Sequence, residues 1–309
     1  MTEIESLLAA LANSGGGAVL ATLVRVDGSA YRGPGARMLV KKDGTSVGAI
    51  SGGCLEKDVV AHAEQVRAAA KPRLVSYDLT AEDDKPWGLN MGCNAVLDVL
   101  LEPCQGVPDW LTALARAESA RETVTLTTGI GGEKLGEHAL RAAKNGERTR
   151  AERGVLHEVI QPPVALVACG DGPDTAPLLA LAGPLGWHAR AVRKDEPLGA
   201  LDARTAAIVM THNYGRDLDL LGALLPSGVG YIGVLGPRTR TDRLLADLGA
   251  RGAKPNQKQL ARLHAPVGLD IGAERPSEIA LAVTAEVQAA FAQRAGGPLQ
   301  ERKGPIHDR

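Results

Sequence analysis

Apolar residues at the start of the chain recur first at helical spacing and then run together as in a strand. Thr2 and Glu5 form a capping-box pattern ahead of the apolar residues 6–13, which predicts a helix there. Residues 18–26 follow as a nearly continuous apolar run, which is typical of a buried strand. The chain is therefore expected to open with a helix followed by a strand.

A hairpin and a second helix are predicted next. Residues 36–51 predict two short strands around Asp43-Gly44, a dipeptide that tolerates the positive φ of a tight turn. A helical period then places apolar residues on one face and leaves Glu56 and Lys57 on the solvent side. The apolar positions of that face are Leu55, Val59, Ala63 and Val66. Residues 73–79 and 95–103 predict two further strands, separated by an irregular loop.

From Pro163 onward, strand patterns and helix patterns alternate. The strand patterns lie at residues 164–169, 206–212 and 228–236. Helical patterns lie between or after them, at residues 216–225, 241–248 and 276–292. This alternation predicts βαβ units and a parallel sheet.

These patterns predict an α/β protein of about two domains, each able to bury its own core. We expect an N-terminal mixed α+β domain over residues 1–105 and a Rossmann-like parallel-sheet domain over residues 163–295. Residues 106–162 are rich in glycine and charge after a strand-like segment at 123–128, and are expected to connect the two domains. Residues 296–309 are expected to be a disordered tail.

Composition narrows the classes of function. The chain has 35 Lys and Arg against 36 Asp and Glu, so no net field attracts nucleic acid or an anionic membrane, and any anion site has to be local. No apolar run reaches the roughly 18 residues needed to span a bilayer, and the N-terminus lacks a secretory pattern. We therefore expect a cytoplasmic protein with no nucleic-acid or membrane partner. Its four cysteines are expected to be reduced.

Two of the cysteines lie in loops that contain glycine. Cys54 follows Gly52 and Gly53 and immediately precedes the predicted helix, where the helix dipole and unpaired N–H groups stabilise a thiolate. The two glycines would let a large group approach the backbone closely. Cys93 lies in the irregular loop before the strand at 95–103. Both thiols are candidates for a reactive group or a soft ligand, and the alternative is a pair of partly buried, inert thiols.

A glycine motif opens the second domain. Gly170 and Gly172 occupy two positions of GxGxxG directly after a strand and before a helix, and Thr175 stands in the place of the third glycine. Such glycines let a pyrophosphate approach the N–H groups at the positive end of the helix. Asp171 and Asp174 place carboxylates in the same region, each unfavourable to a diphosphate by about 1 kcal/mol even in a water-like dielectric. Ordinary NAD binding is therefore disfavoured.

Basic residues follow two other predicted strands of this domain. Arg193 and Lys194 end the second strand, where an acidic residue normally binds a ribose, so a phosphate is favoured there. Gly236 and Arg238 join a strand to a helix, so the backbone dipole and a guanidinium can converge on one anion. We expect phosphate recognition at both places.

His212 is expected at the carboxyl end of a strand, where ligands bind in open α/β sheets. It is a candidate for a ligand contact or for an acid or base, although a histidine in a loop can also be structural. Arg240 and Arg243 are expected to be solvated. The alternative for the whole second domain is a Rossmann-like scaffold with ordinary surface charges.

Five blocks, in order along nearly the whole chain, carry a resemblance to a known family. They are residues 32–63, 87–103, 209–221, 231–240 and 265–287. Together they resemble the XdhC/CoxI family of xanthine dehydrogenase accessory proteins. Five ordered blocks are far more specific than the glycine motif alone.

The resemblance implies a non-catalytic maturation factor that binds the molybdenum cofactor, either plain molybdopterin or a dinucleotide form. Such a factor delivers the cofactor to a molybdenum hydroxylase of the xanthine dehydrogenase type. In the family, delivery is linked to sulfuration of the cofactor by a cysteine desulfurase, and self-association as a homodimer is expected. Cys54 and Cys93 match the family's cysteine blocks and are the implied contacts to molybdenum or its dithiolene, since soft thiolates suit that chemistry.

The chain departs from the family pattern in its second domain. Relatives usually carry a GxGHV[AG]-like loop and an acid at the end of the second strand, whereas residues 170–175 read GDGPDT and residues 191–195 read AVRKD. Two other functions therefore stay open. One is an NAD(P)-dependent oxidoreductase with Gly170 and Gly172 under the pyrophosphate and Arg193 at a 2′-phosphate. The other is a ligand-sensing interaction module with inert cysteines.

Overall fold

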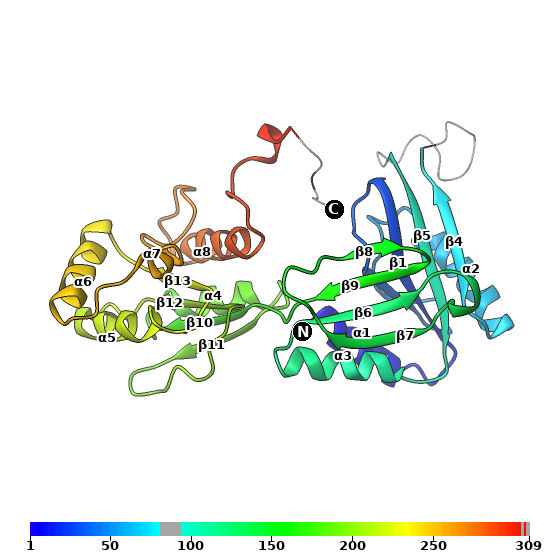
Figure 1. Cartoon of the computed structure of the whole chain (residues 1–309), viewed down its shortest axis with the longest axis horizontal. Helices are drawn as coiled ribbons and strands as arrows, with labels where there is room; N and C mark the ends of the chain where they lie inside the picture. The colour runs from blue at the N-terminus through cyan, green and yellow to red at the C-terminus, as the bar shows by residue number, and fades with distance from the viewer. Residues whose placement is uncertain (81–93, 304–305, 307–309) are drawn as a thin grey trace. The chain divides into compact units, whose positions relative to one another are not determined.

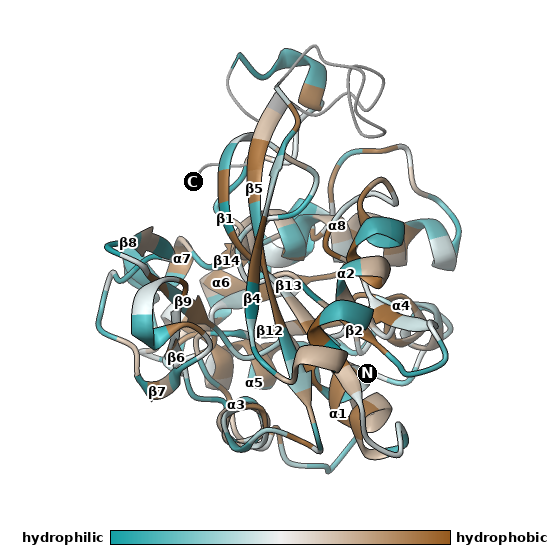
Figure 2. Cartoon of the chain, turned by 90° about the vertical axis from the view of Figure 1, so that its right-hand side faces the viewer, coloured by the Kyte–Doolittle hydropathy of each residue, from teal (hydrophilic) through white to brown (hydrophobic). Residues whose placement is uncertain are grey.

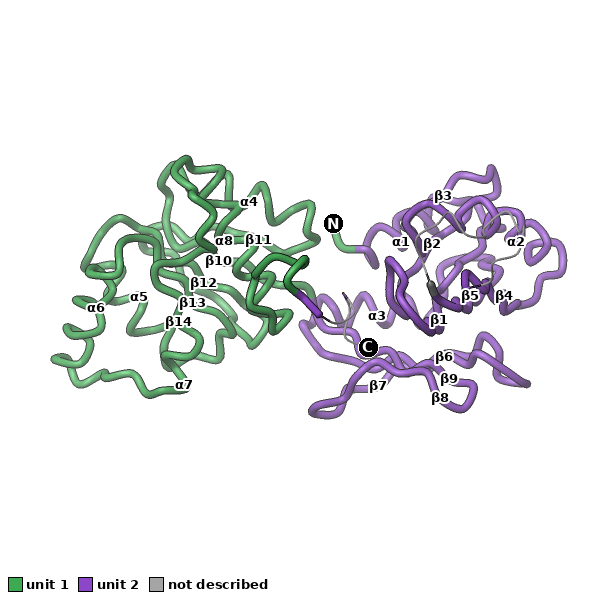
Figure 3. The backbone as a smooth tube through the Cα atoms, turned by 90° about the horizontal axis from the view of Figure 1, so that it is seen from above, with its two compact units in different colours: residues 1–2, 163–301 green, residues 3–162, 302–309 purple. Residues whose placement is uncertain are grey.

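The computed structural model describes residues 1–80, 94–303 and 306 (Figure 1). The chain divides into two compact units, which Figure 3 shows in different colours. The N-terminal unit comprises residues 3–162 and 302–309, and the C-terminal unit comprises residues 1–2 and 163–301. Within the described ranges, no helix is both long and apolar enough to cross a bilayer.

The first sheet of the N-terminal unit has five antiparallel strands in the order β3-β2-β1-β5-β4. They are β1 (Ala18–Ser29), β2 (Arg37–Val40), β3 (Ser46–Gly48), β4 (Arg73–Asp78) and β5 (Asn94–Cys104). The predicted hairpin is confirmed, because Leu39 pairs with Val47 and Val40 with Ser46 across the turn. The long strand β5, largely hydrophobic in Figure 2, pairs with β1 along its whole length.

Helices cover both faces of this sheet. They are α1 (Glu3–Ala12), α2 (Glu56–Ala69) and α3 (Asp109–Ser119). Successive residues of a strand point to opposite faces, so Val19 and Leu23 of β1 join the core under α2, whereas Leu20 joins the core with α1 and α3. Burial on both faces explains the continuous apolar run of β1. The predicted apolar face of α2 is confirmed, since its four residues are at most 1% exposed.

A second antiparallel sheet, ordered β7-β6-β9-β8, completes the N-terminal unit. It contains β6 (Val124–Gly129), β7 (His138–Ala142), β8 (Arg150–Glu152) and β9 (Val155–Ile160), with the short helix η1 (Gly132–Lys134) after β6. Val124 of this sheet packs into the same core as Leu111 and Leu114 of α3. Residues 106–162 thus supply a helix and a sheet to the N-terminal unit.

The C-terminal unit is built on a parallel sheet ordered β11-β10-β12-β13-β14. Its strands are β10 (Ala165–Cys169), β11 (His188–Val192), β12 (Thr205–Val209), β13 (Tyr231–Val234) and β14 (Leu263–His264). Because all five run the same way, the loops after their carboxyl ends meet at one edge of the sheet. The predicted parallel sheet is confirmed.

Helices lie on both faces of the parallel sheet. They are α4 (Thr175–Ala182), α5 (Tyr214–Leu224), α6 (Arg238–Ala250), α7 (Gln257–Leu260) and α8 (Pro276–Phe291), followed by η2 (Leu299–Glu301). Residues of α4 and α8 share one core with β10 and β12, and residues of α5 and α6 share the other. The expected α/β class, with a Rossmann-like domain after a mixed N-terminal domain, is confirmed.

Candidate functional site

The loop between β3 and α2 carries Cys54. Cys54 is a free, half-buried thiol two residues before Glu56, the first residue of α2. Its side chain packs partly against the core under that helix. The predicted position of Cys54 at a helix start is confirmed, and its thiol is neither sealed in the core nor fully in solvent.

Ser51 and Glu56 hold this loop in one shape. The buried Ser51 hydroxyl donates to Glu56 Oε2 at 2.5 Å and accepts the backbone N–H groups of Gly53 and Leu55, both at 3.2 Å. The Ser51 N–H donates to Glu56 Oε1 at 2.9 Å. Glu56 is therefore turned toward the loop, and the expectation that it lies on the solvent side is wrong. Its carboxylate braces the segment that carries Cys54.

The hydrogen bonds of this loop favour the ionised form of Glu56. Partial burial on its own raises the pKa of Glu56, but the hydrogen bonds from Ser51 and from the Leu55 N–H outweigh it and bring the pKa below its ordinary value. Glu56 and Asp58 thus place two acidic side chains in the first turn of α2. Acidic side chains in the first turn are stabilised by the positive end of the helix dipole.

The glycines before Cys54 differ in what surrounds them. Gly53 has φ of +109°, and a Cβ added there would meet nothing within 4 Å, so the space beside Cys54 is open. A Cβ on Gly52 would lie 3.6–3.9 Å from ring carbons of Tyr31, which follows β1 in the neighbouring loop. Tyr31 was not predicted as a site residue.

The other cysteines have different surroundings. Cys93 lies outside the described residues. Cys104 and Cys169 are buried, and burial raises the pKa of each thiol to about 11. A buried thiol with so high a pKa is a poor nucleophile or soft ligand at neutral pH. Of the three described cysteines, Cys54 is the best placed to contact a ligand.

In the C-terminal unit, four loops at the carboxyl edge of the sheet carry the predicted residues. Gly170 directly follows β10, and a Cβ there would collide with the carbonyl oxygen of Met210 just after β12. Gly172 lies beside His212, because a Cβ on it would lie 3.2 Å from the imidazole. The sequence-predicted Gly170, Gly172 and His212 are therefore brought together where β10 and β12 end.

His212 has an uncommon backbone conformation. Its φ is +56°, a left-handed conformation that is uncommon for residues other than glycine. Its exposed imidazole lies with Nε2 3.7 Å from Oδ2 of Asp174, which is mostly buried at the start of α4. The Asp174 carboxylate, which disfavours a diphosphate, thus has a histidine close by.

The predicted basic residues lie on either side of this pair of loops. Arg193 and Lys194 follow β11 and are exposed, and Arg238 is the exposed first residue of α6, after β13 and Gly236. Three strand spacings separate β11 from β13, so the backbones of the two basic places are about 14 Å apart. Arg238 and the pair Arg193 and Lys194 therefore stand on separate loops of this edge.

Lys194 borders a hollow of about 590 Å³ between the loop after β11 and helix α5. Arg216 also lines it, and its guanidinium donates to the carbonyl oxygen of Val192 at 3.3 Å. Asp195, Glu196 and Asp219 add negative charge to the same walls. This hollow lies beside a predicted basic residue, and Arg216 was not predicted to take part in it.

Arg240 is not simply solvated, contrary to expectation. Its guanidinium donates to Oδ2 of Asp217 at 2.7 Å, and Asp217 is 1% exposed. The Thr211 hydroxyl donates to the other oxygen of Asp217 at 2.5 Å. Asp217 thus ties the loop before His212 to helix α6, because a buried carboxylate needs partners on both oxygens.

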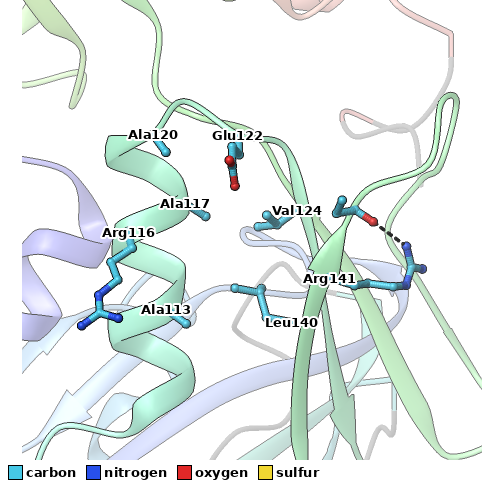
Figure 4. A pocket seen from close by; sticks show the side chains of 9 residues that line it. Ala113, Arg116, Ala117, Ala120, Glu122, Val124, Leu140 and Arg141 are labelled. Atoms are coloured by element: carbon cyan, nitrogen blue, oxygen red, sulfur yellow. Dashed lines mark hydrogen bonds between the residues drawn. The ribbon is translucent and has the colours of Figure 1, made fainter.

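A separate hollow of about 360 Å³ lies between α3 and the strands β6 and β7 (Figure 4). Its floor is mainly alanine, valine and leucine, and Arg116, Glu122 and Arg141 stand at its margins. The Arg141 guanidinium donates to the carbonyl oxygen of Ala142 at 3.0 Å. None of the lining residues belongs to a predicted site motif.

Comparisons with known proteins agree with the two-part architecture. A model of the XdhC and CoxI family matches residues 11–78, and a model of the XdhC Rossmann domain matches residues 166–287. A crystal structure from Bacillus halodurans, described as a xanthine dehydrogenase, superposes with a TM-score of 0.79 at 31% identity, covering 97% of this chain and 99% of that one.

Two curated relatives are similar over most of their length. A Bacillus subtilis protein described as a probable xanthine dehydrogenase subunit is 31% identical over 93% of this chain and 97% of its own. The molybdenum cofactor insertion chaperone PaoD of Escherichia coli is 29% identical over 89% of this chain and 83% of its own. With both family models matched and these relatives aligned nearly end to end, the chain belongs to the XdhC and CoxI family.

Proposed function

We propose that this protein binds the molybdenum cofactor, protects it and delivers it to a molybdenum hydroxylase of the xanthine dehydrogenase type. The observation that carries the proposal is the half-buried, free thiol of Cys54 on a loop braced by Ser51 and Glu56, with open space at Gly53. The similarity over 89% of the chain to a protein named a molybdenum cofactor insertion chaperone supports it.

The residues around Cys54 fit such a cargo. A thiolate is a soft ligand that suits molybdenum and its dithiolene sulfurs, and the glycines before it leave room for a large group. One or two thiolate contacts, from Cys54 and Cys93, would hold the cofactor yet allow its release. The role of the chain in this proposal is to bind and shield the cofactor and to hand it over, without catalysing a reaction itself.

The C-terminal unit is proposed to hold a phosphate or nucleotide group. Gly170 keeps the loop after β10 close to the neighbouring strand, as in a dinucleotide-binding fold, while Lys194 and Arg216 supply positive charge beside the hollow at α5. Arg238 offers a second anion contact at the start of α6. A phosphomonoester at either basic place avoids the Asp174 carboxylate. A diphosphate bound over the loop after β10 would be repelled by that carboxylate.

Three partners belong to this proposal. The recipient is a xanthine dehydrogenase-type hydroxylase, and a cysteine desulfurase supplies the sulfur that the cofactor needs before delivery. The protein itself is proposed to act as a homodimer. The relatives' names, which refer to xanthine dehydrogenase and to cofactor insertion, support the first of these partners.

A transfer assay tests the function. The protein is purified with its cofactor and mixed with a xanthine dehydrogenase-type enzyme made in a cofactor-deficient host, and the enzyme's activity and molybdenum content are followed. We expect activation that needs the loaded protein and is faster than with free cofactor. Equal activation by free cofactor, with no molybdenum leaving the protein, would refute delivery.

A further inference from the structure

Tyr31 stands out among the side chains near Cys54. Aromatic residues make up 3% of the chain, and this one is 68% exposed in the loop between β1 and β2. Single apolar residues on a surface are common and need no explanation. Tyr31 lies beside Gly52, two residues before Cys54, and this position makes its exposure informative.

Tyr31 is held against that loop. Its ring carbons lie 3.6–3.9 Å from the position that a Cβ on Gly52 would occupy, so the ring stands beside the loop before Cys54. The next residue, Arg32, donates to the carbonyl oxygen of Ala49 at 3.1 Å and pairs with Glu3 at 2.9 Å. These contacts fix the chain beside the ring, while most of the ring area stays in solvent.

The ring and the thiol lie within reach of one ligand. Two residues span at most about 7 Å of chain, so the Cα atom of Cys54 is no farther than that from the Cα atom of Gly52 under the ring. Gly53, between them, has open space where a side chain would otherwise stand. An exposed aromatic ring beside Gly52 and a half-buried sulfur two residues farther along the chain therefore flank the open space at Gly53.

We propose that Tyr31 is the stacking surface for the pterin ring of the bound cofactor, while Cys54 contacts its metal and dithiolene end. This inference rests on the proposed function, because it names the residue that contacts the pterin part of the same cofactor. An exposed aromatic ring stacks on a flat heterocycle through dispersion and removes apolar area of both from water. Gly52 has no side chain that could cover the part of the ring that faces it.

The test compares Tyr31→Ala and Tyr31→Phe with the unaltered protein. Each is purified anaerobically from a molybdate-supplied, cofactor-producing host, and pterin per protein is measured before and after dilution and gel filtration. Free pterin-6-carboxylate, followed by fluorescence quenching, serves as a probe without metal or dithiolene. We expect Tyr31→Ala to weaken pterin binding between about fivefold and about a hundredfold. Tyr31→Phe should stay within about twofold of the unaltered protein.

The outcomes separate this inference from the proposed function. If the unaltered protein carries molybdenum and pterin and Tyr31→Ala retains both equally well through dilution, the stacking role is wrong while the carrier function stands. If the unaltered protein carries neither, the proposed function itself fails. Loss of pterin in Tyr31→Phe as severe as in Tyr31→Ala would point to the hydroxyl and would also overturn stacking.

Discussion

The Ser51 hydroxyl donates to the Glu56 carboxylate at 2.5 Å across the loop that carries Cys54. The same hydroxyl receives the N–H groups of Gly53 and Leu55, so the backbone on both sides of Cys54 is bonded to this pair. A thiol on a loop fixed in this way meets its ligand without first losing conformational freedom, which favours binding. The hydrogen-bonded pair of Ser51 and Glu56 is therefore part of the proposed site, together with the Cys54 thiol.

Ser51→Ala should loosen the loop without abolishing the fold. It removes one charge-assisted bond, leaves the Gly53 N–H without its acceptor and leaves the Leu55 N–H only its bond to Glu56, so the free energy of unfolding should fall by about 1–3 kcal/mol. Urea denaturation measures this, and cofactor retention should fall with it. Ser46→Ala, at an exposed position of β3, is the matched control and should change neither. Equal stability of the two variants would show that the brace contributes nothing.

Glu56→Gln should change how stability depends on pH. The pKa of Glu56 in the folded protein lies below its ordinary value of 4.5, so its ionised form stabilises the fold above that pH, and this contribution is lost as pH falls through the folded value. The unaltered protein should therefore be more stable than Glu56→Gln at about pH 7, and the gap should narrow below about pH 4.5. A constant gap across that range contradicts the bonding described here.

Alkylation should discriminate among the described thiols. Iodoacetamide under native conditions should modify Cys54 well before Cys104 and Cys169, because those two are buried and burial raises the pKa of each to about 11. Peptide mass spectrometry reads the order, and a Cys93→Ser background removes the remaining cysteine. Modification of Cys54 only after global unfolding would favour an inert thiol and the ligand-sensing alternative.

Arg240→Ala should destabilise the protein strongly. It leaves Asp217, which is 1% exposed, without its ionic partner, and breaking such a pair costs about 3 kcal/mol. Arg251→Ala, directly after α6, is the matched control, because its pair with Asp219 is largely exposed and should contribute less than about 1 kcal/mol. Chemical denaturation of the full chain compares them. Similar losses in both variants would mean that Asp217 does not depend on Arg240.

Much of the fold follows from local patterns. The hairpin at Asp43-Gly44, the buried face of α2 and the parallel order of β10 and β12 were predicted because each rests on short-range periodicity or turn chemistry. The strands β7 and β8 were not predicted. Their residues are mostly exposed, so the sequence there lacks the apolar alternation that marks a strand. These segments are recognised as strands only by their pairing, β7 with β6 and β8 with β9.

The site was less predictable than the fold. Cys54 and His212 could be proposed from neighbouring glycines and from strand ends, since those are local signals. Tyr31 meets Gly52 across 21 positions of sequence, and Arg240 meets Asp217 across 23, and no periodicity links such pairs. Glu56 was predicted to face solvent because its helical position is polar, but its carboxylate folds back onto the loop before the helix.

The most direct test measures molybdenum by elemental analysis and pterin by fluorescence in protein purified anaerobically from a molybdate-supplied, cofactor-producing host, alongside folded Cys54→Ser. We predict molybdenum and pterin near one per chain in the unaltered protein, and neither in Cys54→Ser. Equal cofactor in the two would remove Cys54 from the site. Absence of both from the unaltered protein would contradict the carrier function. A thermal shift on adding NAD or NADP to that empty protein would then favour an oxidoreductase, and no shift would favour a ligand-sensing module.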